Sequence, residues 1–432
     1  MSNKVTDEDI DILLLKNGHI LDPNANIDRV ADILIEKDTI KEIGKNISKH
    51  GKTIDCKDKT IVPGLIDMHT HLREPGYEYK ETIATGVAAA RAGGFTAIAC
   101  MPNTNPVIDS RSYIEFIKKR AKGLLVDVYP LGSVTKGMLG EELTEMGDMV
   151  AAGAVGFSDD GLPIKNSLIL RSSLEYSKIF GTPIIEHCED LNLSGDGVMN
   201  EGYYATLLGL SAIPSISEEV MVMRDILIAE FTHSPIHIAH VSTKGSVKII
   251  EDAKKRGVKV TAETCPHYLL LTDKNLTSFD TNMKMKPPLR TEEDKKALIE
   301  GLTKGVIDVI ASDHAPHHSD EKDIEFNKAA FGIIGLETTV GLILTHFVNK
   351  RIFSLPDFIE MMSVRPRKIL NLPLITIDKN SPANITILDV NQEWKVDKNT
   401  FKSKSRNTPF EGWEMKGKSV GVINNGKYYL NI

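Results

Sequence analysis

The feature that most constrains the fold is an alternation of short apolar runs with helix-like stretches over residues 64–311. Each run has four to six residues, the usual length of a buried strand. The eight runs are Leu65–Met68, Thr96–Met101, Val126–Leu131, Ala154–Phe157, Pro183–Glu186, Ile236–Ala239, Lys259–Ala262 and Ile307–Ala311. Strands that alternate with helices predict parallel βα units, and eight such units predict a closed (β/α)8 barrel of the TIM type.

Three of the intervening stretches carry clear helix signals. Lys80–Ala92 is rich in alanine and is followed by Gly93-Gly94, and glycine commonly ends a helix. Ser246–Lys255 and Thr291–Thr303 are similar, and acidic residues directly after Thr291 favour a helix start there. These stretches support the βα interpretation.

The two ends of the chain predict β-structure instead. The apolar runs there are Ile12–Leu15, Ala31–Glu36 and Thr39–Ile43 near the start, and Ala383–Leu388, Val420–Ile423 and Lys427–Leu430 near the end. Asn17-Gly18 indicates a hairpin turn, and Asn424-Asn425-Gly426 indicates another turn. Because the ends share this character, we expect residues 1–62 and 378–432 to form one small β-sandwich domain beside a barrel at 63–377.

Composition excludes several classes of function. The net charge of -7, without a basic stripe, disfavours nucleic acid as a partner. No apolar run approaches the roughly 20 residues that a membrane span needs, and the polar segment Met1–Ile10 does not resemble a signal peptide. The four cysteines form no Cys-x-x-Cys pair, which is typical of a reducing compartment. We therefore expect a cytoplasmic protein without a membrane partner.

Polar side chains stand at or just after the ends of five predicted strands. They are His69 and His71 on the first strand, Asp159 and Asp160 after the fourth, His187 on the fifth, His240 on the sixth and Asp313 after the eighth. In a (β/α)8 barrel the C-terminal strand ends open on one face, where active sites are built. We therefore expect these distant side chains to converge.

Four histidines with one or two carboxylates suit a borderline metal such as Zn²⁺. His69 and His71 are two residues apart on a strand, so both imidazoles can reach one ion. Singly, each group has an ordinary interpretation: a chance His-x-His, an Asp-Asp-Gly turn, a hydrogen-bonded core histidine or a helix cap. Their joint position favours a metal site, and it leaves open whether one or two ions bind and whether Asp159 or Asp160 bridges them.

A pair of metal ions suits hydrolysis of an amide or imide. Two metals activate a water at neutral pH and polarise a substrate carbonyl. A nearby carboxylate can take the proton of the water and pass it to the leaving nitrogen, and Asp313 is placed for that shuttle.

Apart from Asp159 and Asp160, these residues lie within a series of motifs that resembles the dihydroorotases of bacteria and archaea, in the amidohydrolase superfamily. In chain order the motifs are Asp67–Gly76 (DMHTHLREPG), Met101–Asn105 (MPNTN), Glu186–Asp190 (EHCED), His240–Ser242 (HVS), Glu263–His267 (ETCPH), Ser312–His317 (SDHAPH), Phe331–Thr338 (FGIIGLET) and Ser403–Phe410 (SKSRNTPF). The resemblance covers nearly the whole chain.

The resemblance implies a fold, a reaction and partners. The fold is a (β/α)8 barrel with a small β domain made from both chain ends. The reaction is the reversible closure of N-carbamoyl-L-aspartate to L-dihydroorotate in pyrimidine synthesis, with Zn²⁺ as cofactor. A homodimer and an association with aspartate carbamoyltransferase are the assemblies to expect.

The resemblance also implies residue roles. The metal ligands would be His69 and His71 for one ion, His187 and His240 for the other, Asp160 as bridge, and Asp313 as both ligand and proton shuttle. The substrate contacts would be His71, Arg73, Asn103, Lys286, His317, Phe331 and Gly332.

Two of these contacts carry alternatives. Arg73 suits a carboxylate because a guanidinium binds it through two hydrogen bonds, but Arg73 could instead form a surface ion pair with Glu74 or Glu78. Lys286 stands where many relatives carry Asn, and it could reach an anionic substrate as a point charge or lie in solvent. The polar stretch 315–330 is a candidate for a mobile lid.

Two other functions are weighed against this one. Hydantoinases, dihydropyrimidinases and allantoinases resemble the chain too, but they usually bridge their metals with a carboxylated lysine, and Gly156–Gly161 contains none. Neutral hydantoins would also gain little from Arg73. A non-catalytic scaffold is expected to lack some of the metal ligands, whereas all are present here. The sequence therefore favours a dihydroorotase.

Overall fold

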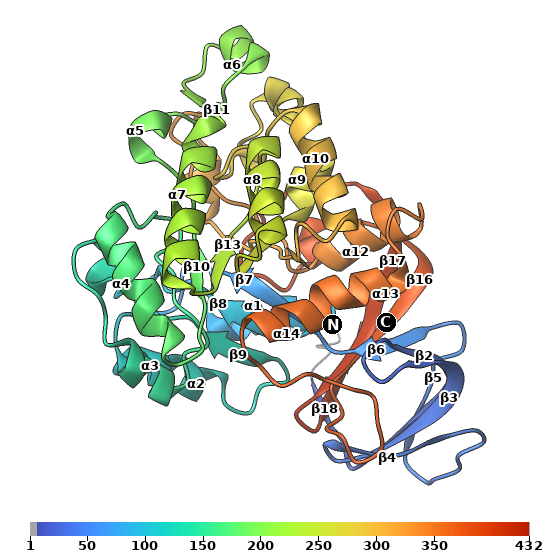
Figure 1. Ribbon diagram of the computed structural model, residues 1–432. Coiled ribbons are helices and arrows are strands. Elements are labelled where there is room, and N and C mark those ends of the chain that lie inside the picture. The colour runs from blue at the N-terminus through green and yellow to red at the C-terminus, as the bar shows by residue number, and fades with distance from the viewer. Residues whose placement is uncertain (1–6, 432) are drawn as a thin grey trace.

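The computed structural model describes residues 7–431, and a ring of parallel strands stands at its centre (Figure 1). Seven of the eight predicted strands are present as β7 (Leu65–Thr70), β8 (Phe95–Cys100), β9 (Asp127–Pro130), β10 (Ile184–Glu186), β13 (Ile236–Ile238), β14 (Val260–Thr264) and β15 (Val309–Ile310). The fourth run is reduced to one residue, Phe157, which forms parallel bridges to Gly132 and Ile184. The predicted alternation is confirmed, with this position as its shortest element.

Parallel pairing closes the ring. β7 pairs with β8 and β8 with β9, and β10, β13, β14 and β15 pair in that order. A parallel bridge between Thr70 and His314 joins the last unit to the first, and the backbone N–H of His71 donates to the carbonyl of His314 at 2.8 Å. All C-terminal strand ends therefore lie at one end of the barrel.

The predicted helices begin and end where their capping residues stand. α1 (Ile83–Gly93) starts after Thr82, whose hydroxyl accepts from the N–H of Thr85, and it ends at Gly94 with φ of 100°. It is shorter than the predicted Lys80–Ala92 because this cap lies inside the expected range. α10 (Glu292–Thr303) starts after Thr291 in a capping box, as predicted.

The remaining helices surround the ring or extend above it (Figure 1). Those around the ring are α2 (Arg111–Ala121), α3 (Met146–Ala152), α4 (Ser167–Lys178), α7 (Ile216–Thr232), α8 (Lys244–Lys255), α12 (Thr339–Ile343), α13 (Leu355–Ile359) and α14 (Arg365–Ile369). The excursions that rise from it are α5 (Leu191–Ser194), α6 (Tyr203–Leu208), β11 (Met199–Asn200) and β12 (Ala212–Ile213). α9 (Pro266–Leu270) and α11 (Ser319–Lys322) lie in loops that follow strands. Within the described residues, no helix is both long and apolar enough to cross a membrane.

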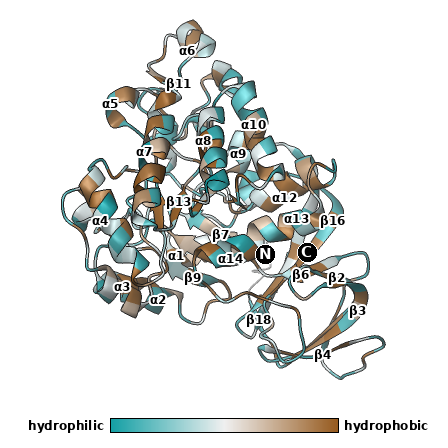
Figure 2. Cartoon of the chain, in the orientation of Figure 1, coloured by the Kyte–Doolittle hydropathy of each residue, from teal (hydrophilic) through white to brown (hydrophobic). Residues whose placement is uncertain are grey.

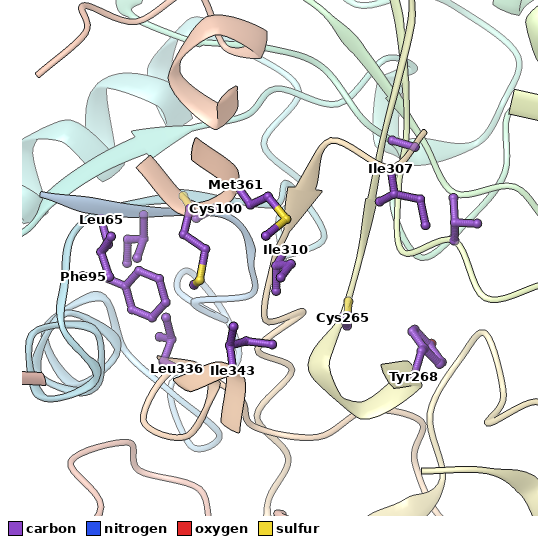
Figure 3. Close-up of a cluster of buried hydrophobic side chains, with 14 of the residues drawn as sticks. Leu65, Phe95, Cys100, Cys265, Tyr268, Ile307, Ile310, Leu336, Ile343 and Met361 are labelled. Carbon is purple, nitrogen blue, oxygen red and sulfur yellow. The ribbon is translucent and has the colours of Figure 1, made fainter. Parts of the chain in front are cut away.

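Two apolar clusters hold the barrel together, one on each face of its strands. Ile98 of β8 packs with Val87 of α1 in the larger cluster, which fills the layer between strands and helices; Figure 3 shows part of this cluster around Phe95 and Ile310. Ala97 and Ala99 of β8 belong to a separate cluster. Because alternate residues of a strand point to opposite faces, this second cluster fills the inside of the barrel.

Both chain ends meet in one nine-stranded sheet, which Figure 1 shows in blue and red beside the barrel. Its strands are β1 (Glu8–Asp9), β2 (Ile12–Asp22), β3 (Ile27–Glu36), β4 (Thr39–Gly44), β5 (Lys52–Asp55), β6 (Thr60–Pro63), β16 (Ile385–Lys395), β17 (Glu414–Asn424) and β18 (Lys427–Leu430). β6 pairs with β16, and this pair joins the N-terminal strands to the C-terminal ones. Strands from both halves contribute to one apolar cluster, so the sheet curls around its own core.

The turn predicted at Asn17-Gly18 is wrong, although the one predicted at 424–426 is confirmed. β2 runs straight through Asn17 and pairs with β3 on both sides of it, with a register shift between Leu15 and Gly18. Asn17 has φ of 60°, as the extra residue of a bulge can, and the chain reverses at residues 23–26 instead. Pairing along the whole of β3 therefore overrides the local turn signal.

Candidate active site

The polar side chains at the strand ends converge, as predicted. Donor atoms of His69, His71 and Asp160 lie within 4.8 Å of one another, and so do donor atoms of Asp160, His187 and His240. All five side chains are buried. The structure thus contains two adjacent three-residue ligand groups that share Asp160.

The two carboxylate oxygens of Asp160 face different histidine pairs. Oδ2 lies 3.5 Å from the Nε2 atoms of both His69 and His71. Oδ1 lies 3.4 Å from Nδ1 of His187 and 3.1 Å from Nε2 of His240. A carboxylate that offers one oxygen to each group has the arrangement needed to bridge two ions.

Both carboxylate oxygens of Asp159, the other candidate for the bridge, accept hydrogen bonds from residues outside the ligand groups. Its Oδ1 accepts from the backbone N–H groups of Val134 and Thr135, and its Oδ2 accepts from the Thr135 hydroxyl at 2.5 Å. Adjacent residues of an extended segment point to opposite sides, so only Asp160 reaches the histidines.

Asp313 lies beside the first ligand group. Its Oδ1 is 3.1 Å from Nε2 of His71 and 3.5 Å from Nε2 of His69. It also belongs to a third cluster of donor atoms, with Cys265 and His267. This position on the first group agrees with the double role that the family resemblance implies for Asp313.

Buried partners orient the histidine rings. Nδ1 of His69 donates to Glu263 at 2.5 Å, Nδ1 of His71 pairs with Oδ1 of Asn103 at 2.8 Å, and Nε2 of His187 pairs with Glu189 at 3.2 Å. In each ring the opposite nitrogen faces Asp160, as ligating histidines in metal sites are usually oriented, and Nδ1 of His187 also lies 2.9 Å from Nε2 of His240. Nε2 of His69 is buried without a hydrogen-bond partner among the described residues. The donor set therefore fits a cation.

Charge in the cluster agrees with that fit. Burial lowers the pKa of His69, but Glu263, Asp160 and Asp313 outweigh this effect and hold it well above its ordinary value. In the same way, Asp160 and Glu189 overcome burial and raise the pKa of His187 to about 9. The carboxylates thus attract protons onto the imidazoles, and a metal cation would take the place of those protons.

Three residues of the site have positive φ angles that are uncommon outside glycine. These angles are 62° for Arg73, 33° for His240 and 47° for Asp313. Such conformations cost free energy and persist where the surrounding structure enforces them, often at functional sites. Their presence at three strand ends supports the same location for the site.

Arg73 and His317 lie together on the side of Asp313. Nη2 of Arg73 is 3.4 Å from Nε2 of His317, and its Nε donates to the carbonyl of Pro316. Within residues 7–431, Arg73 does not form the surface ion pair with Glu74 or Glu78 that was the predicted alternative. Glu74 pairs with Arg120, and Glu78 accepts from the N–H of Gly76. The buried guanidinium therefore faces the site and not solvent.

The segment with Phe331 and Gly332 lies against His317. Nε2 of His317 donates to the carbonyl of Phe331 at 2.8 Å. Gly332 has φ of 128°, and a Cβ there would lie 2.7 Å from Cβ of Ala315, so this close approach requires glycine. The polar stretch 315–330 contains α11 and the buried side chains of Lys322 and Phe326.

Lys286 points toward the site. Its Nζ lies 2.9 Å from Oε1 of Glu189 and 5.4 Å from the centre of the Phe331 ring, and its side chain is 25% exposed. Lys286 also borders a small cavity together with His187. Its charge is therefore matched by the same carboxylate that orients His187.

Sequence reasoning missed the roles of Glu263 and Glu189. Both lie inside quoted motifs; Glu263 directly follows an apolar run and Glu189 stands three residues after one, so their position near strand ends was a usable signal. Glu263 acts on His69, which belongs to another strand, and Glu189 acts on His187 in its own loop. Only the folded chain reveals these partners.

Comparisons with known proteins agree with this geometry. A family model described as dihydro-orotase-like matches residues 58–246. A dihydroorotase from Acetivibrio thermocellus is 51% identical over 416 residues, which cover 96% of this chain and 98% of that protein. A dihydroorotase from Geobacter metallireducens is 51% identical over 419 residues, with the same two coverages.

Solved structures share the whole fold. An L-hydantoinase (dihydropyrimidinase) from Arthrobacter aurescens has a TM-score of 0.85 and 26% identity, over 97% of this chain and 96% of that chain. A D-hydantoinase (dihydropyrimidinase) from a Thermus species has a TM-score of 0.83 and 25% identity, over 96% and 94%. With half of its residues identical to two dihydroorotases along almost its full length, the chain belongs to the dihydroorotase family.

Proposed function

We propose that the protein is a dihydroorotase, which interconverts L-dihydroorotate and N-carbamoyl-L-aspartate by opening and closing a cyclic amide. The observation that carries this proposal is the combination of two ligand groups bridged by Asp160 with a buried guanidinium next to them. The first feature suits amide hydrolysis, and the second suits a substrate with a carboxylate.

The proposed cofactor is Zn²⁺, one or two ions per chain, because nitrogen and carboxylate ligands of this kind suit zinc. The proposed ligands are His69 and His71 for one ion, His187 and His240 for the other, Asp160 between them, and Asp313 beside the first. When bound, such ions polarise a substrate carbonyl and bring the pKa of a water near neutrality.

Asp313 is the proposed proton shuttle. Burial alone would raise its pKa, but the neighbouring His69 and His71 outweigh that effect and keep the pKa below its ordinary value. Asp313 is therefore ionised at neutral pH and ready to accept a proton from water. Its carboxyl group can then return that proton to the nitrogen that leaves as the ring opens.

The proposed contacts of the substrate carboxylate are Arg73, Asn103 and His317, with the backbone of Phe331 and Gly332 alongside. Arg73 supplies a fixed positive charge, and His317 lies within 3.4 Å of it. His71 lies between the metal group and Asn103. Lys286 contributes positive charge through its position beside Glu189 and Phe331.

The alternative substrates are the neutral rings of hydantoinases and dihydropyrimidinases, whose fold the chain shares. The absence of a lysine in 156–161 and the buried Arg73 favour dihydroorotate over these rings. A non-catalytic scaffold is disfavoured because all of the proposed ligands converge. The cytoplasmic location, an association with aspartate carbamoyltransferase and the domain limits at residues 62 and 377 stay predictions.

The test is hydrolysis of L-dihydroorotate by the purified protein, followed by absorbance, before and after chelation and after addition of Zn²⁺. We expect activity that chelation removes and zinc restores. Metal-dependent hydrolysis of hydantoin or dihydrouracil, but not of dihydroorotate, would move the protein to the neutral-ring group. Zinc binding without hydrolysis of any of these rings would support the scaffold instead.

A further inference from the structure

The motif Ser403–Phe410 has no role in the mechanism above, yet it reaches the active site. It precedes β17, in the part of the chain that otherwise builds the nine-stranded sheet. Its residues Ser403 and Asn407 are buried. A segment from the far end of the chain thus passes directly behind the loops that carry the proposed substrate contacts.

Asn407 bonds to both of those loops at once. Its Oδ1 accepts from the backbone N–H of His317 at 3.2 Å. Its Nδ2 donates to the carbonyls of Ala315 at 3.0 Å and Gly332 at 3.1 Å. Its own backbone carbonyl accepts from the N–H of Ile334 at 3.0 Å. All hydrogen-bonding groups of the amide side chain therefore join the segment after β15 to the segment around Gly332.

Lys322 also donates a hydrogen bond to the carbonyl of Gly332. Its Nζ donates to the carbonyls of Ala330 at 2.7 Å, Gly332 at 3.0 Å and Lys284 at 3.2 Å. Over residues 7–431, no carboxylate lies within ion-pair distance of this buried ammonium, so its partners are backbone carbonyls. The carbonyl of Gly332 thus accepts two hydrogen bonds from side chains, which fixes the direction of its peptide.

Glu81 anchors the start of the motif beside the catalytic strand end. Its carboxylate accepts from the Ser403 hydroxyl and from the N–H of Lys404 at 3.1 Å. The same carboxylate lies 3.4 Å from Nε2 of His314, the residue after Asp313. The motif is therefore fastened at two points, one near Asp313 and one between His317 and Gly332.

We propose that Asn407 is a positioning residue that sets the distance between His317 and Gly332, and so determines how tightly the site binds a substrate carboxylate. It touches neither the metal ligands nor the proposed substrate position, and it acts through the two loops that it joins. The expected change in KM rests on the proposed function. The expected effect on the His317 backbone, which Asn407 holds in place, does not depend on the substrate.

The kinetic test compares Asn407→Ala with Asn399→Ala, each on L-dihydroorotate and on neutral dihydrouracil. Asn399 is the matched control, because it lies in the same C-terminal region, is exposed, and among residues 7–431 has side-chain hydrogen bonds to Asp397 alone. For Asn407→Ala we expect KM for dihydroorotate to rise about tenfold while kcat changes less than about twofold, since the loss of about 1.4 kcal/mol of binding is a factor of ten. Any activity on dihydrouracil should stay near the wild-type value, and the control should match the wild type on both. Equal losses on both substrates would overturn the proposal.

A second measurement separates this inference from the identity of the substrate. Hydrogen exchange at the His317 amide should speed up in Asn407→Ala and stay unchanged in Asn399→Ala, whichever ring the enzyme opens. If Asn407→Ala does not fold, Asn407→Asp replaces it. This variant keeps the oxygen that accepts from the His317 N–H and loses both hydrogen bonds donated by Nδ2. The backbone amides around Gly332 should then exchange faster. Unchanged exchange in these loops would overturn the positioning role even if dihydroorotate is confirmed as the substrate.

Discussion

The two tasks proposed for Asp313 are those of metal ligand and proton shuttle, and its surroundings suit both. It lies within 3.5 Å of two proposed metal ligands, and those same imidazoles keep its pKa below the ordinary value against the effect of burial. Its backbone has a φ of 47°, which aims the carboxylate across the end of the barrel. The lowered pKa of Asp313 therefore originates in His69, at the end of β7, and in His71, which directly follows β7.

Replacing Asp313 with Asn should keep the fold and remove turnover. The amide has nearly the same shape but cannot accept the proton of the water, and general acid–base groups contribute roughly 10²–10⁴-fold to rates. We expect kcat on dihydroorotate to fall by at least about 10²-fold, with an unchanged melting temperature. Activity close to that of the wild type in the folded variant would remove Asp313 from the shuttle role.

At the residue scale, the sequence predicted the convergence of the metal-ligand candidates because strand ends and barrel geometry together determine where they meet. It left Asp159 and Asp160 undecided, since the choice depends on which of the two points toward Thr135. It could not supply the partner of Lys286 either, because Glu189 follows a different strand. The sequence shows which residue types could act in the site, but the direction in which each side chain points is determined only by the folded structure.

At the scale of elements, β14 contributes orientation through Glu263. This residue donates no proposed ligand atom, but its carboxylate holds His69 through Nδ1 and also lies 3.3 Å from Nε2 of His237 on β13. The imidazoles of His69 and His237 and the carboxylate of Glu263 are all fully buried, so the attraction between them is strong. One strand thus fixes the ligand of another strand across the barrel.

Replacing Glu263 with Gln should weaken metal binding without unfolding the protein. Changes to such supporting residues typically reduce metal affinity 10–100-fold. We expect the dialysed variant to retain less zinc, measured by elemental analysis, while the exposed variant Glu292→Gln retains the wild-type amount. A Glu263→Gln protein with full zinc content would contradict the orienting role of this carboxylate.

Elements were predicted well where packing agrees with local signals, as for α10 after Thr291. They were predicted poorly where tertiary pairing decides. The fourth strand shrinks to Phe157, and the bulge at Asn17 replaces a turn. In both places the outcome depends on a neighbouring strand that a local pattern does not contain.

At the scale of the whole molecule, α7 presents a second apolar face to solvent. Ile216, Val220, Met223, Leu227 and Phe231 are each 36–68% exposed, and Figure 2 colours much of this helix brown. Their spacing of three or four residues makes a stripe about 22 Å long at 1.5 Å per residue. A stripe with this spacing fits another helix, and contiguous exposed apolar surface usually marks an interface.

We propose that a second copy of the chain covers this stripe in a homodimer. A two-fold axis across α7 would pair each copy with the same helix running the other way, which closes the assembly. Glu219 lies near the start of the stripe, and Arg171 stacks on Phe231 at its end. Arg171 already pairs with Glu175 at 3.1 Å and Glu219 packs against Gly245, so the contact would rest on the apolar stripe itself.

Replacing Leu227 with Glu should convert the dimer to a monomer, because a charge would be buried within the contact. The control is Leu374→Glu, at a leucine of similar exposure beyond α14. Sedimentation should give a dimer for the wild type and the control, and a monomer for Leu227→Glu. A monomeric wild type, or a dimer that survives Leu227→Glu, would exclude this interface.

The pairing of β6 with β16 has a consequence for synthesis of the protein on the ribosome. Leu65, at the start of the first barrel strand, bonds to Thr386, 321 residues later, and Asn407 closes the loops around the site later still. The nascent chain thus emerges with β2–β6 able to pair among themselves but with β6 still lacking β16, and with an incomplete pocket. The site can be completed only after Asn407 has left the ribosome, and until β16 has been synthesised the unpaired edge of β6 is free to pair with other strands.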